Sequence, residues 1–529
     1  MTKSEQQKIE DAIETIDNKA KSYGLDYYDT EFLIANEELM DQLSAYVLPI
    51  RFHHWTFGKE YQKQKTMKQY GMSGTIYECV INSDPSYAFL SESNNLTEMK
   101  VVIAHVLGHV DFFKNNMLYN TTNKRMVTEC ALNAKKIADY YFQYGEEIVE
   151  RWIDACMSIA RHCELARNSD NTKWLEKKEI AFPEELDMKE EFDFLFRNDK
   201  MKKITEWQEQ QKRSKPIMEK DLLLFLMHNR FVDLENWQKD VMSIVRQEMR
   251  YFMPNIQTKI LNEGWSCFWH QKIIEDLDLE CDFLKDDDND WYTYYSAMNS
   301  RVLHPGSRGR LNPYLVGYTI LKDIYETTGG TEQDKIDALL DIRATHTDAL
   351  LIKNHLNEKV IEELDLFTFE LLDKEWTVTE TTNWERSRDI LTEQLVEAHI
   401  PTIYIIDDDY MNNRELFLVH DYKGDELEEE SAIRTLAYIS KLWERPVTLR
   451  TAAHLTYEVE VDKNDNKKGL RGENLIVYIR HDGKKADIIL DQEILKPTSQ
   501  IAADYFDAKW RMHKFEEKIK ENASDENLI

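Results

Sequence analysis

The sequence is poor in proline, glycine and cysteine for a chain of 529 residues. Only ten prolines and 16 glycines interrupt it, so long stretches run without a helix breaker, which favours long helices. The six cysteines include no CxxC pair, and so sparse a set in a long chain excludes a disulfide scaffold. We therefore expect reduced thiols, as in the cytoplasm.

Basic residues and long apolar runs are also scarce. The 67 lysines and arginines are outnumbered by 98 acidic residues, and the net charge of −31 argues against binding to nucleic acid or to anionic membranes. No run approaches the ~18 apolar residues of a membrane span, and the charged N-terminus lacks the apolar region of a signal peptide. We predict a cytoplasmic protein with no nucleic-acid partner and no membrane span.

The spacing of apolar residues predicts a mainly α protein that ends in a small α+β domain. Helix-like periodicity dominates up to about residue 390, whereas short strand-like runs surround one helical stretch from about residue 400 onward. We expect five parts: an N-terminal helical lobe (1–170), a charged connector (171–220), a second helical lobe (221–395), the small α+β domain (396–500), and a C-terminal helix with an acidic tail (501–529).

One helix-like run, VVIAHVLGHV at 101–110, is apolar except for His105 and His109. Their spacing of four residues places both imidazoles on one helical face, one turn apart. A helix that is apolar all round is buried, and buried imidazoles need partners. Zinc-binding helices present histidines at this spacing, although hydrogen bonds within a core can also satisfy such a pair.

A second helical segment, NEGWSCFWH, carries Glu263 and His270 two turns apart on one face. Glu-Gly-Trp is similar to the third-ligand helix of gluzincin-type metallopeptidases. We predict a zincin-like pair of helices in which His105, His109 and Glu263 hold zinc with an open fourth position. In the alternative, Glu263 and His270 pair with each other or with arginines. Gly264 within this helix indicates close packing or a site.

The proton acceptor of such a site has to come from elsewhere. Val106 stands where HExxH proteins carry their general-base glutamate. Glu129, 20 residues after His109, is a candidate base or a rival third ligand. His270 is a candidate for proton transfer, for a further ligand, or for a residue that supports a ligand.

Four other residues lie in or next to these motifs and are further candidates for the site. Asp111 is expected to orient an imidazole or to cap the helix end. His53 and His54 are expected either to line the pocket or to pack against Trp55. Cys267 is expected on a different helical face from Glu263 and His270, away from the site.

Five motifs, in this order, resemble the SpoVR family (stage V sporulation protein R): RFHHWTFGK, YECVINSDPSYAFL, AHVLGHVDFFKNN, TKILNEGWSCFWH and NPYLVGYTILKDI. The similarity extends from about residue 10 into the C-terminal domain, where ERPVTLRT also fits, but the charged connector lacks the expected proline-rich stretch. The resemblance implies a role in forming the spore cortex, which is peptidoglycan. The resemblance also implies two partner proteins, because family members in other bacteria accompany a PrkA-type serine kinase and a von Willebrand A-like protein. The family's histidine pair corresponds to His105 and His109, and its NEGW glutamate to Glu263.

We therefore expect a zinc-dependent amide hydrolase, similar to an amidase or peptidase, that acts on a peptidoglycan peptide or its precursor. No export signal is evident, while the cortex lies outside the forespore membrane. We therefore expect that the substrate is a cytosolic precursor, that the protein is released, or that it acts indirectly. One alternative is a non-catalytic regulatory or assembly factor with a structural metal site. Another is an Fe(II) oxygenase, since two histidines and one carboxylate also bind Fe(II).

Overall fold

A computed structural model describes residues 3–494, except for 71–77, 166–216, 286–293, 295–301, 305–310, 367–368, 373–374, 379–383, 397–399, 411, 424 and 463–466. The chain forms two compact units, each made of two separate stretches: 1–146 with 250–399, and 147–249 with 400–529. This division differs from the expected succession of lobes along the chain, because the helices of 1–146 and 250–399 share one core. Most of the connector expected at 171–220 and the whole of the tail expected at 501–529 lie outside the described residues.

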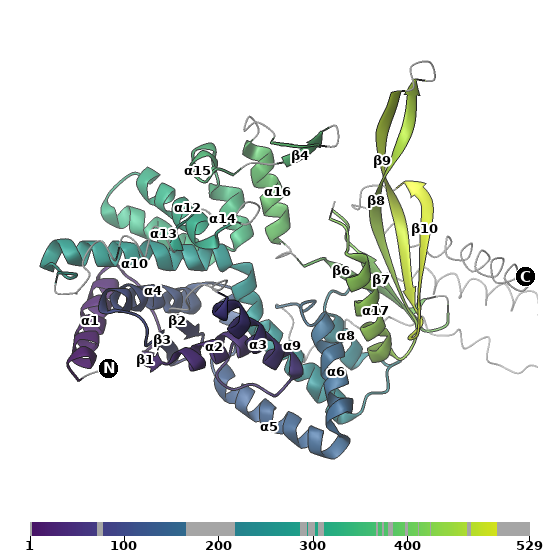
Figure 1. Ribbon diagram of the computed structural model, residues 1–529, viewed down its shortest axis with the longest axis horizontal. Helices are drawn as coiled ribbons and strands as arrows, with labels where there is room; N and C mark the ends of the chain where they lie inside the picture. The colour runs from purple at the N-terminus through teal and green to yellow at the C-terminus, as the bar shows by residue number, and fades with distance from the viewer. Residues whose placement is uncertain are drawn as a thin grey trace, which may run out of the picture. The chain divides into compact units, whose positions relative to one another are not determined.

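The first unit is mainly helical and contains a small sheet (Figure 1). Its first stretch holds α1 (Lys3–Ser22), β1 (Thr30–Ala35), α2 (Glu37–Tyr46), α3 (Trp55–Gln69), β2 (Glu78–Ile81), β3 (Ser86–Ser91), α4 (Leu96–Asn115), η1 (Tyr119–Thr121) and α5 (Met126–Tyr144). Its second stretch holds α10 (Lys259–Cys281), α12 (Pro313–Thr327), α13 (Glu332–Thr345), α14 (Asp348–His355), α15 (Glu358–Glu363), β4 (Phe369–Leu372), β5 (Glu375–Val378) and α16 (Trp384–Val396). Strand β3 pairs in parallel with β1 and antiparallel with β2, which places Glu78 opposite Leu90.

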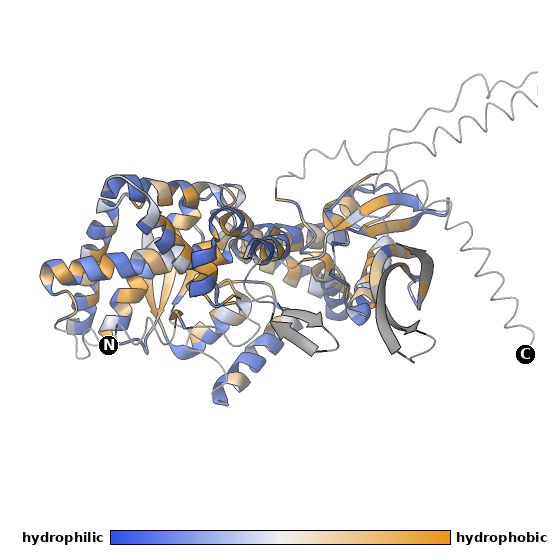
Figure 2. Cartoon of the chain, turned by 90° about the horizontal axis from the view of Figure 1, so that it is seen from above, coloured by the Kyte–Doolittle hydropathy of each residue, from blue (hydrophilic) through white to orange (hydrophobic). Residues whose placement is uncertain are grey.

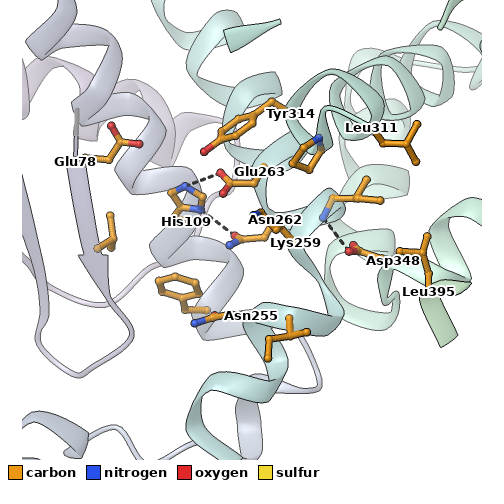
Figure 3. A pocket seen from close by; sticks show the side chains of 15 residues that line it. Glu78, His109, Asn255, Lys259, Asn262, Glu263, Leu311, Tyr314, Asp348 and Leu395 are labelled. Atoms are coloured by element: carbon orange, nitrogen blue, oxygen red, sulfur yellow. Dashed lines mark hydrogen bonds and ion pairs between the residues drawn. The ribbon is translucent and has the colours of Figure 1, made fainter. Parts of the chain in front are cut away.

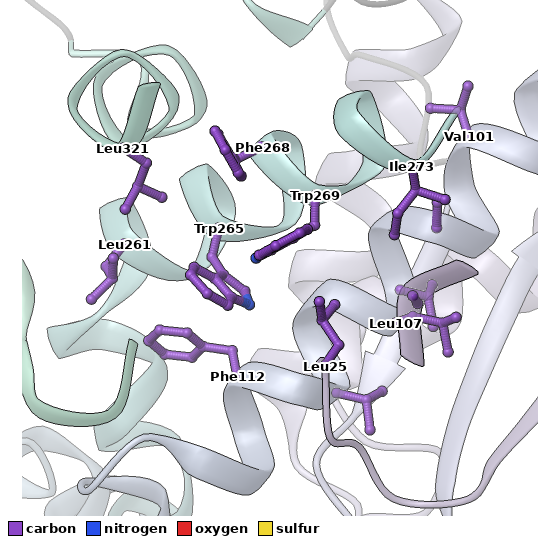
Figure 4. Close-up of a cluster of buried hydrophobic side chains, with 14 of the residues drawn as sticks. Leu25, Val101, Leu107, Phe112, Leu261, Trp265, Phe268, Trp269, Ile273 and Leu321 are labelled. Atoms are coloured by element: carbon purple, nitrogen blue, oxygen red, sulfur yellow. The ribbon is translucent and has the colours of Figure 1, made fainter. Parts of the chain in front are cut away.

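Helix α4 is the buried centre of this unit. Nearly all of its side chains from Thr97 to Phe113 are buried, as expected for a helix with no polar face. It packs between α1 and α10, where Phe112 meets Trp265 and Trp269 of α10 in a large apolar cluster (Figure 4). Figure 2 shows hydrophilic residues (blue) beside hydrophobic ones (orange) on the helices around α4. Helix α1, for example, buries Ile9, Ile16 and Ala20 on one face and exposes most of its charged residues.

Helix α4 begins with a capping box formed by Asn95 and Glu98. The side chain of Asn95 accepts a hydrogen bond from the Glu98 N–H at 2.8 Å, and the Glu98 carboxylate accepts one from the Asn95 N–H at 3.0 Å. We expect Asn95→Ala to lower the free energy of unfolding by about 1 kcal/mol, because a helix N–H loses its acceptor. Chemical denaturation checks this. Asn95→Asp, which keeps an acceptor oxygen, serves as the control and is expected to stay near wild type.

Glycines set the spacing of α10 from its two neighbours. A Cβ at Gly264 would lie 2.3 Å from the carbonyl carbon of Gly317 in α12, and one at Gly317 would lie 2.1 Å from the Ile260 oxygen. On the other side, a Cβ at Gly108 of α4 would lie 2.8 Å from the Cα of Ser266. The backbone of α10 therefore contacts both α4 and α12 directly, which confirms the close packing expected at Gly264.

The second unit combines helices with a mixed sheet. Its elements are α6 (Glu146–Ile159), α8 (Leu222–His228), α9 (Asn236–Gln257, which continues into the first unit), β6 (Ile403–Tyr410), β7 (Glu415–His420), α17 (Glu429–Trp443), β8 (Val447–Asp462), β9 (Lys467–His481) and β10 (Ala486–Ile494). The strand order is β10-β9-β8-β7-β6, with β7 and β8 parallel and the other pairs antiparallel. The five strands with α17 have the α+β character predicted for the C-terminal part of the chain. None of the helices in the described part of the chain combines the length and hydropathy of a membrane span.

Two helix boundaries depend on single residues. Gly145, whose positive φ of 91° ends α5, separates α5 from α6. Pro254 lies inside α9, and the break between α9 and α10 comes at Thr258.

Candidate metal centre

The two histidines of α4 lie together beside α10. His105 is 5% exposed and His109 is 8% exposed, and their ring centroids are 4.6 Å apart. This is the arrangement predicted from their spacing. The close approach at Gly108, between the two histidines in the sequence, brings α10 within reach of both rings.

Two residues of α10 orient these rings through their Nδ1 atoms. The Nδ1–H of His109 donates to Oδ1 of Asn262 at 3.0 Å, because an amide oxygen can only accept. Nδ1 of His105 lies 2.9 Å from Nδ1 of His270, so one ring donates and the other accepts. The first bond directs the Nε2 lone pair of His109 toward the interior of the site, which is how supporting residues prepare a metal-binding histidine.

Glu263 faces the Nε2 atoms of both histidines. Its Oε2 lies 3.4 Å from Nε2 of His109 and 3.8 Å from Nε2 of His105. Burial alone disfavours the charged carboxylate, but the nearby imidazoles outweigh it and hold the pKa of Glu263 well below its usual range. The same carboxylate raises the pKa of His109 despite its burial. The three predicted ligands therefore lie together.

Glu78 and Tyr314 complete this side of the site and were not predicted as site residues. Glu78 comes from β2, and its Oε1 lies 3.9 Å from Nε2 of His105. Tyr314 comes from the first turn of α12, its ring stacks 6.3 Å from that of His105, and its hydroxyl points toward Glu78 and Glu263 (Figure 3). Burial raises the pKa values of both Glu78 and Tyr314. The only sequence signal was their presence in family-like motifs.

Among the described residues, two groups of three side chains bring their ligand atoms close together, and Glu263 is in neither group although its Oε2 lies near Nε2 of both histidines. One consists of Glu78, His105 and His109, and the other of His105, Cys267 and His270, with all atoms of a group within 4.8 Å of one another. The expectation that Cys267 lies on another helical face is wrong, because Glu263, Cys267 and His270 follow one face of α10 at i, i+4 and i+7. Burial raises the pKa of the Cys267 thiol and lowers that of His270.

The first group opens into a cavity of about 710 Å³. Glu78, His109, Asn262, Glu263 and Tyr314 form its polar inner wall (Figure 3). Apolar side chains cover much of the remainder, among them Val80, Phe113, Ile256, Leu311, Pro313 and Leu395, with Lys259 and Asp348 toward one side. Asp348 accepts hydrogen bonds at 2.8 Å from the N–H groups of Ile260 and Leu261 at the start of α10.

The remaining predicted residues lie outside this cavity. Glu129 is half-buried in the first turn of α5 and belongs to neither ligand group. His54 caps α3, with Nδ1 2.7 Å from the hydroxyl of Thr56, and exposed His53 borders a separate cavity of about 500 Å³.

Asp111 is fully buried, but its contacts are not with an imidazole. It accepts hydrogen bonds from Arg343 at 2.5 Å, from the Trp265 indole at 2.9 Å and from the Asp26 N–H at 2.7 Å. Burial raises its pKa to about 6, although these partners lower it. Asp111 therefore joins α4 to α10 and α13 and supports the helices that carry the site.

Comparison with known proteins agrees with the resemblance in the motifs. The family described as "SpoVR like protein" matches residues 3–400, and the "SpoVR-like C-terminal domain" matches residues 401–454. The chain is 30% identical over 378 residues to the "Uncharacterized protein YcgB" of Escherichia coli (strain K12), covering 67% of this chain and 72% of that protein. No solved structure matches significantly. All the residues of the metal centre fall within the range 3–400, and the chain belongs to the SpoVR family.

Proposed function

We propose that this protein is a metal-dependent hydrolase whose cation, zinc in the first instance, is held by His105, His109 and Glu263. One observation carries the proposal. Nε2 of His105 and Oε2 of Glu263 are buried atoms with no hydrogen-bond partner among the described residues, and they lie 3.8 Å apart. Buried polar atoms without partners are costly, and a cation between them satisfies both.

The spacing of the three donor groups supports the same assignment. Two ligand atoms that each lie ~2.1 Å from a tetrahedral zinc ion are about 3.4 Å from each other. The distances from Glu263 Oε2 to His109 and His105, 3.4 and 3.8 Å, are close to that value. Two imidazoles with one carboxylate are a ligand set that zinc takes in catalytic sites.

When bound, such a cation polarises a carbonyl and lowers the pKa of water to roughly 7. The chain supplies the rest of the chemistry. Asn262 and His270 hold the two imidazoles in orientation. The Tyr314 hydroxyl, whose raised pKa keeps it protonated, can donate a hydrogen bond to an oxygen that gains negative charge. The apolar side chains of the cavity exclude water from the remainder of the substrate.

The substrate that we propose is an amide within a short peptide. A cavity of about 710 Å³ has the size that accommodates a drug-sized or peptide ligand. Membership of the SpoVR family suggests a peptidoglycan peptide or its precursor. Proton transfer was predicted for Glu129 or His270, but neither lines the cavity. An acceptor there has to act through a water molecule or another residue.

The activity is tested with the zinc-loaded protein and a mixture of muropeptides and peptidoglycan precursors. Mass spectrometry is expected to detect two fragments, split at an amide bond, whose masses together exceed that of the substrate by one water. Metal-free protein and Glu263→Ala are expected to leave the mixture unchanged. If the wild-type protein also leaves it unchanged while retaining its metal, the hydrolase proposal fails.

A non-catalytic role is the second candidate, and one observation favours it. Val106, at the position of the general base in HExxH proteins, is fully buried and apolar. The metal site would then stabilise the fold, and partners such as a PrkA-type kinase or a von Willebrand A-like protein would be docked by other surfaces. Complementation of a deletion strain by folded His105→Ala protein would establish this reading. Oxygen consumption by the iron-loaded protein tests an Fe(II) oxygenase.

Loss of the Asn262 hydrogen bond is expected to weaken metal binding without removing a ligand. Asn262→Ala frees His109 to rotate and to change tautomer, so we expect zinc affinity to fall roughly 10- to 100-fold. Competition with a chelating dye measures it. Asn36→Ala, which removes the N-cap of α2 outside the site, controls for general loss of stability and is expected to bind zinc as wild type does. Unchanged affinity in Asn262→Ala would contradict the role of the amide.

A further inference from the structure

We propose that Glu78 is a fourth protein ligand, so that Glu78, His105, His109 and Glu263 hold one divalent cation and the thiol of Cys267 does not. This inference rests on the proposed function, because that proposal supplies the cation. It adds a further ligand, Glu78, and a preference for one class of metal ion, neither of which hydrolysis requires. The resulting set has two nitrogen and two oxygen donors from β2, α4 and α10, so the water that the proposed hydrolysis needs would take a fifth position.

The position of Glu78 is the first argument. Its Oε1 lies 3.9 Å from Nε2 of His105, almost the same distance as Glu263 Oε2 on the other side, at 3.8 Å. With His105 and His109 it forms one of the two groups of ligand atoms within 4.8 Å of one another. Figure 3 shows Glu78 and Glu263 approaching from opposite sides of the histidine ring of His109, from separate elements.

The charge of the site is the second argument. Glu78 and Glu263 place two carboxylates in a site where their side chains are only 20% and 17% exposed. Two like charges in such a place repel each other and lose hydration. A divalent cation offsets two carboxylates in full, whereas a site with Glu263 alone would keep an excess positive charge.

The geometry of the other group argues against it. Nδ1 of His105 and Nδ1 of His270 are 2.9 Å apart, which is a hydrogen-bond distance and shorter than the ~3.4 Å between ligands of one tetrahedral zinc. This hydrogen bond occupies Nδ1 of His105, so Nε2 of the same ring remains directed at the carboxylates of Glu78 and Glu263. His270 therefore acts as a positioning residue, and Cys267 lies next to it without being a ligand.

A nitrogen and oxygen donor set has a consequence for metal choice. Carboxylate and imidazole suit Mn²⁺, Fe²⁺ and Zn²⁺, while thiolate ligands select softer ions. We therefore expect the centre to prefer these divalent ions over Cd²⁺. The cobalt(II) form is a suitable probe, because a thiolate ligand produces an intense charge-transfer band in the near ultraviolet and nitrogen or oxygen ligands do not.

The experiment is a Co²⁺ titration of the full chain after removal of metal, followed by absorbance and by the rise in melting temperature. We expect wild type to bind Co²⁺ without a thiolate band. Glu78→Gln keeps the size of the side chain but removes its charge. Its Co²⁺ affinity should fall by more than the roughly 10- to 100-fold loss that follows when a ligand loses a hydrogen-bond partner outside the metal's own ligand set. Glu129→Gln, a half-buried carboxylate outside the site, and Cys267→Ser should bind as wild type does.

The possible results distinguish a failure of the Glu78 assignment from a failure of the proposed metal site. Wild-type affinity in Glu78→Gln, or a thiolate band that Cys267→Ser abolishes, overturns the ligand assignment while the metal site stands. Absence of Co²⁺ and Zn²⁺ binding in the wild type overturns both. Misfolding does not obscure the result, because metal-free Glu78→Gln loses a repulsion with Glu263 and is expected to melt no lower than metal-free wild type.

Discussion

Glu263→Ala and His109→Ala are each expected to abolish stoichiometric metal binding, whereas the wild-type protein should contain about one zinc equivalent per chain after addition of zinc and dialysis. Each variant removes a donor that lies in the middle of the site, since Glu263 Oε2 is 3.4 Å from His109 and 3.8 Å from His105. Neither alanine nor a water molecule at that place can supply the lost charge or the directed lone pair. Elemental analysis of protein purified without chelator measures the effect.

His53→Ala is the matched control for this experiment. His53 is exposed and borders a different cavity, so its loss is expected to leave the metal content unchanged. Equal zinc in wild type and Glu263→Ala would remove Glu263 from the site. A wild-type protein that takes up less than about 0.2 equivalents with zinc in excess would contradict the metal centre itself.

Gly317→Ala is expected to destabilise the first unit by about 3 kcal/mol or more. The new Cβ would lie 2.1 Å from the Ile260 oxygen and 2.8 Å from the Cα of Gly264, both of which are backbone atoms of α10. A flexible side chain could move aside, but these atoms cannot move without shifting the whole helix. Chemical denaturation should record the loss, and zinc affinity should fall as well, because α10 carries Glu263 and Asn262.

Gly58→Ala is the control, with an effect of opposite sign. Gly58 is an exposed helical glycine in α3, and a Cβ there meets nothing within 4 Å. Alanine is about 1 kcal/mol more favourable than glycine in a helix, so this variant should become slightly more stable. Gly317 is buried, so if Gly317→Ala lost no more stability than a typical surface substitution, α10 and α12 would not be in backbone contact as described.

The half of the site that lies on α4 could be predicted because its geometry is local. The spacing of four residues from His105 to His109 fixes their common face, and the capping box at Asn95 and Glu98 fixes where the helix begins. The same rule correctly aligned Glu263 with His270. The rule also places Cys267, four residues from Glu263, on that face, where the structure has it.

Other parts of the site could not be predicted, because their partners are distant in the sequence. Glu78 on β2 and Tyr314 on α12 reach the histidines only once the sheet and α12 pack around α4 and α10. Asp111 was expected to orient an imidazole, but the fold offers it a stronger partner in Arg343, 232 residues away. A single sequence holds no signal for such pairings.

The sequence by itself determined the buried histidine helix, the helical character of most of the chain, the α+β domain from about residue 400, and membership of the SpoVR family. These follow from periodicity, spacing and motifs, which act within a segment. Only the tertiary structure decided that 1–146 and 250–399 form one unit, that glycines bring α10 against α4 and α12, and that two carboxylates face the histidine pair. These features depend on which apolar surfaces pack against each other and exclude water. The packed surfaces come from segments that are far apart in the sequence, so no local pattern specifies them.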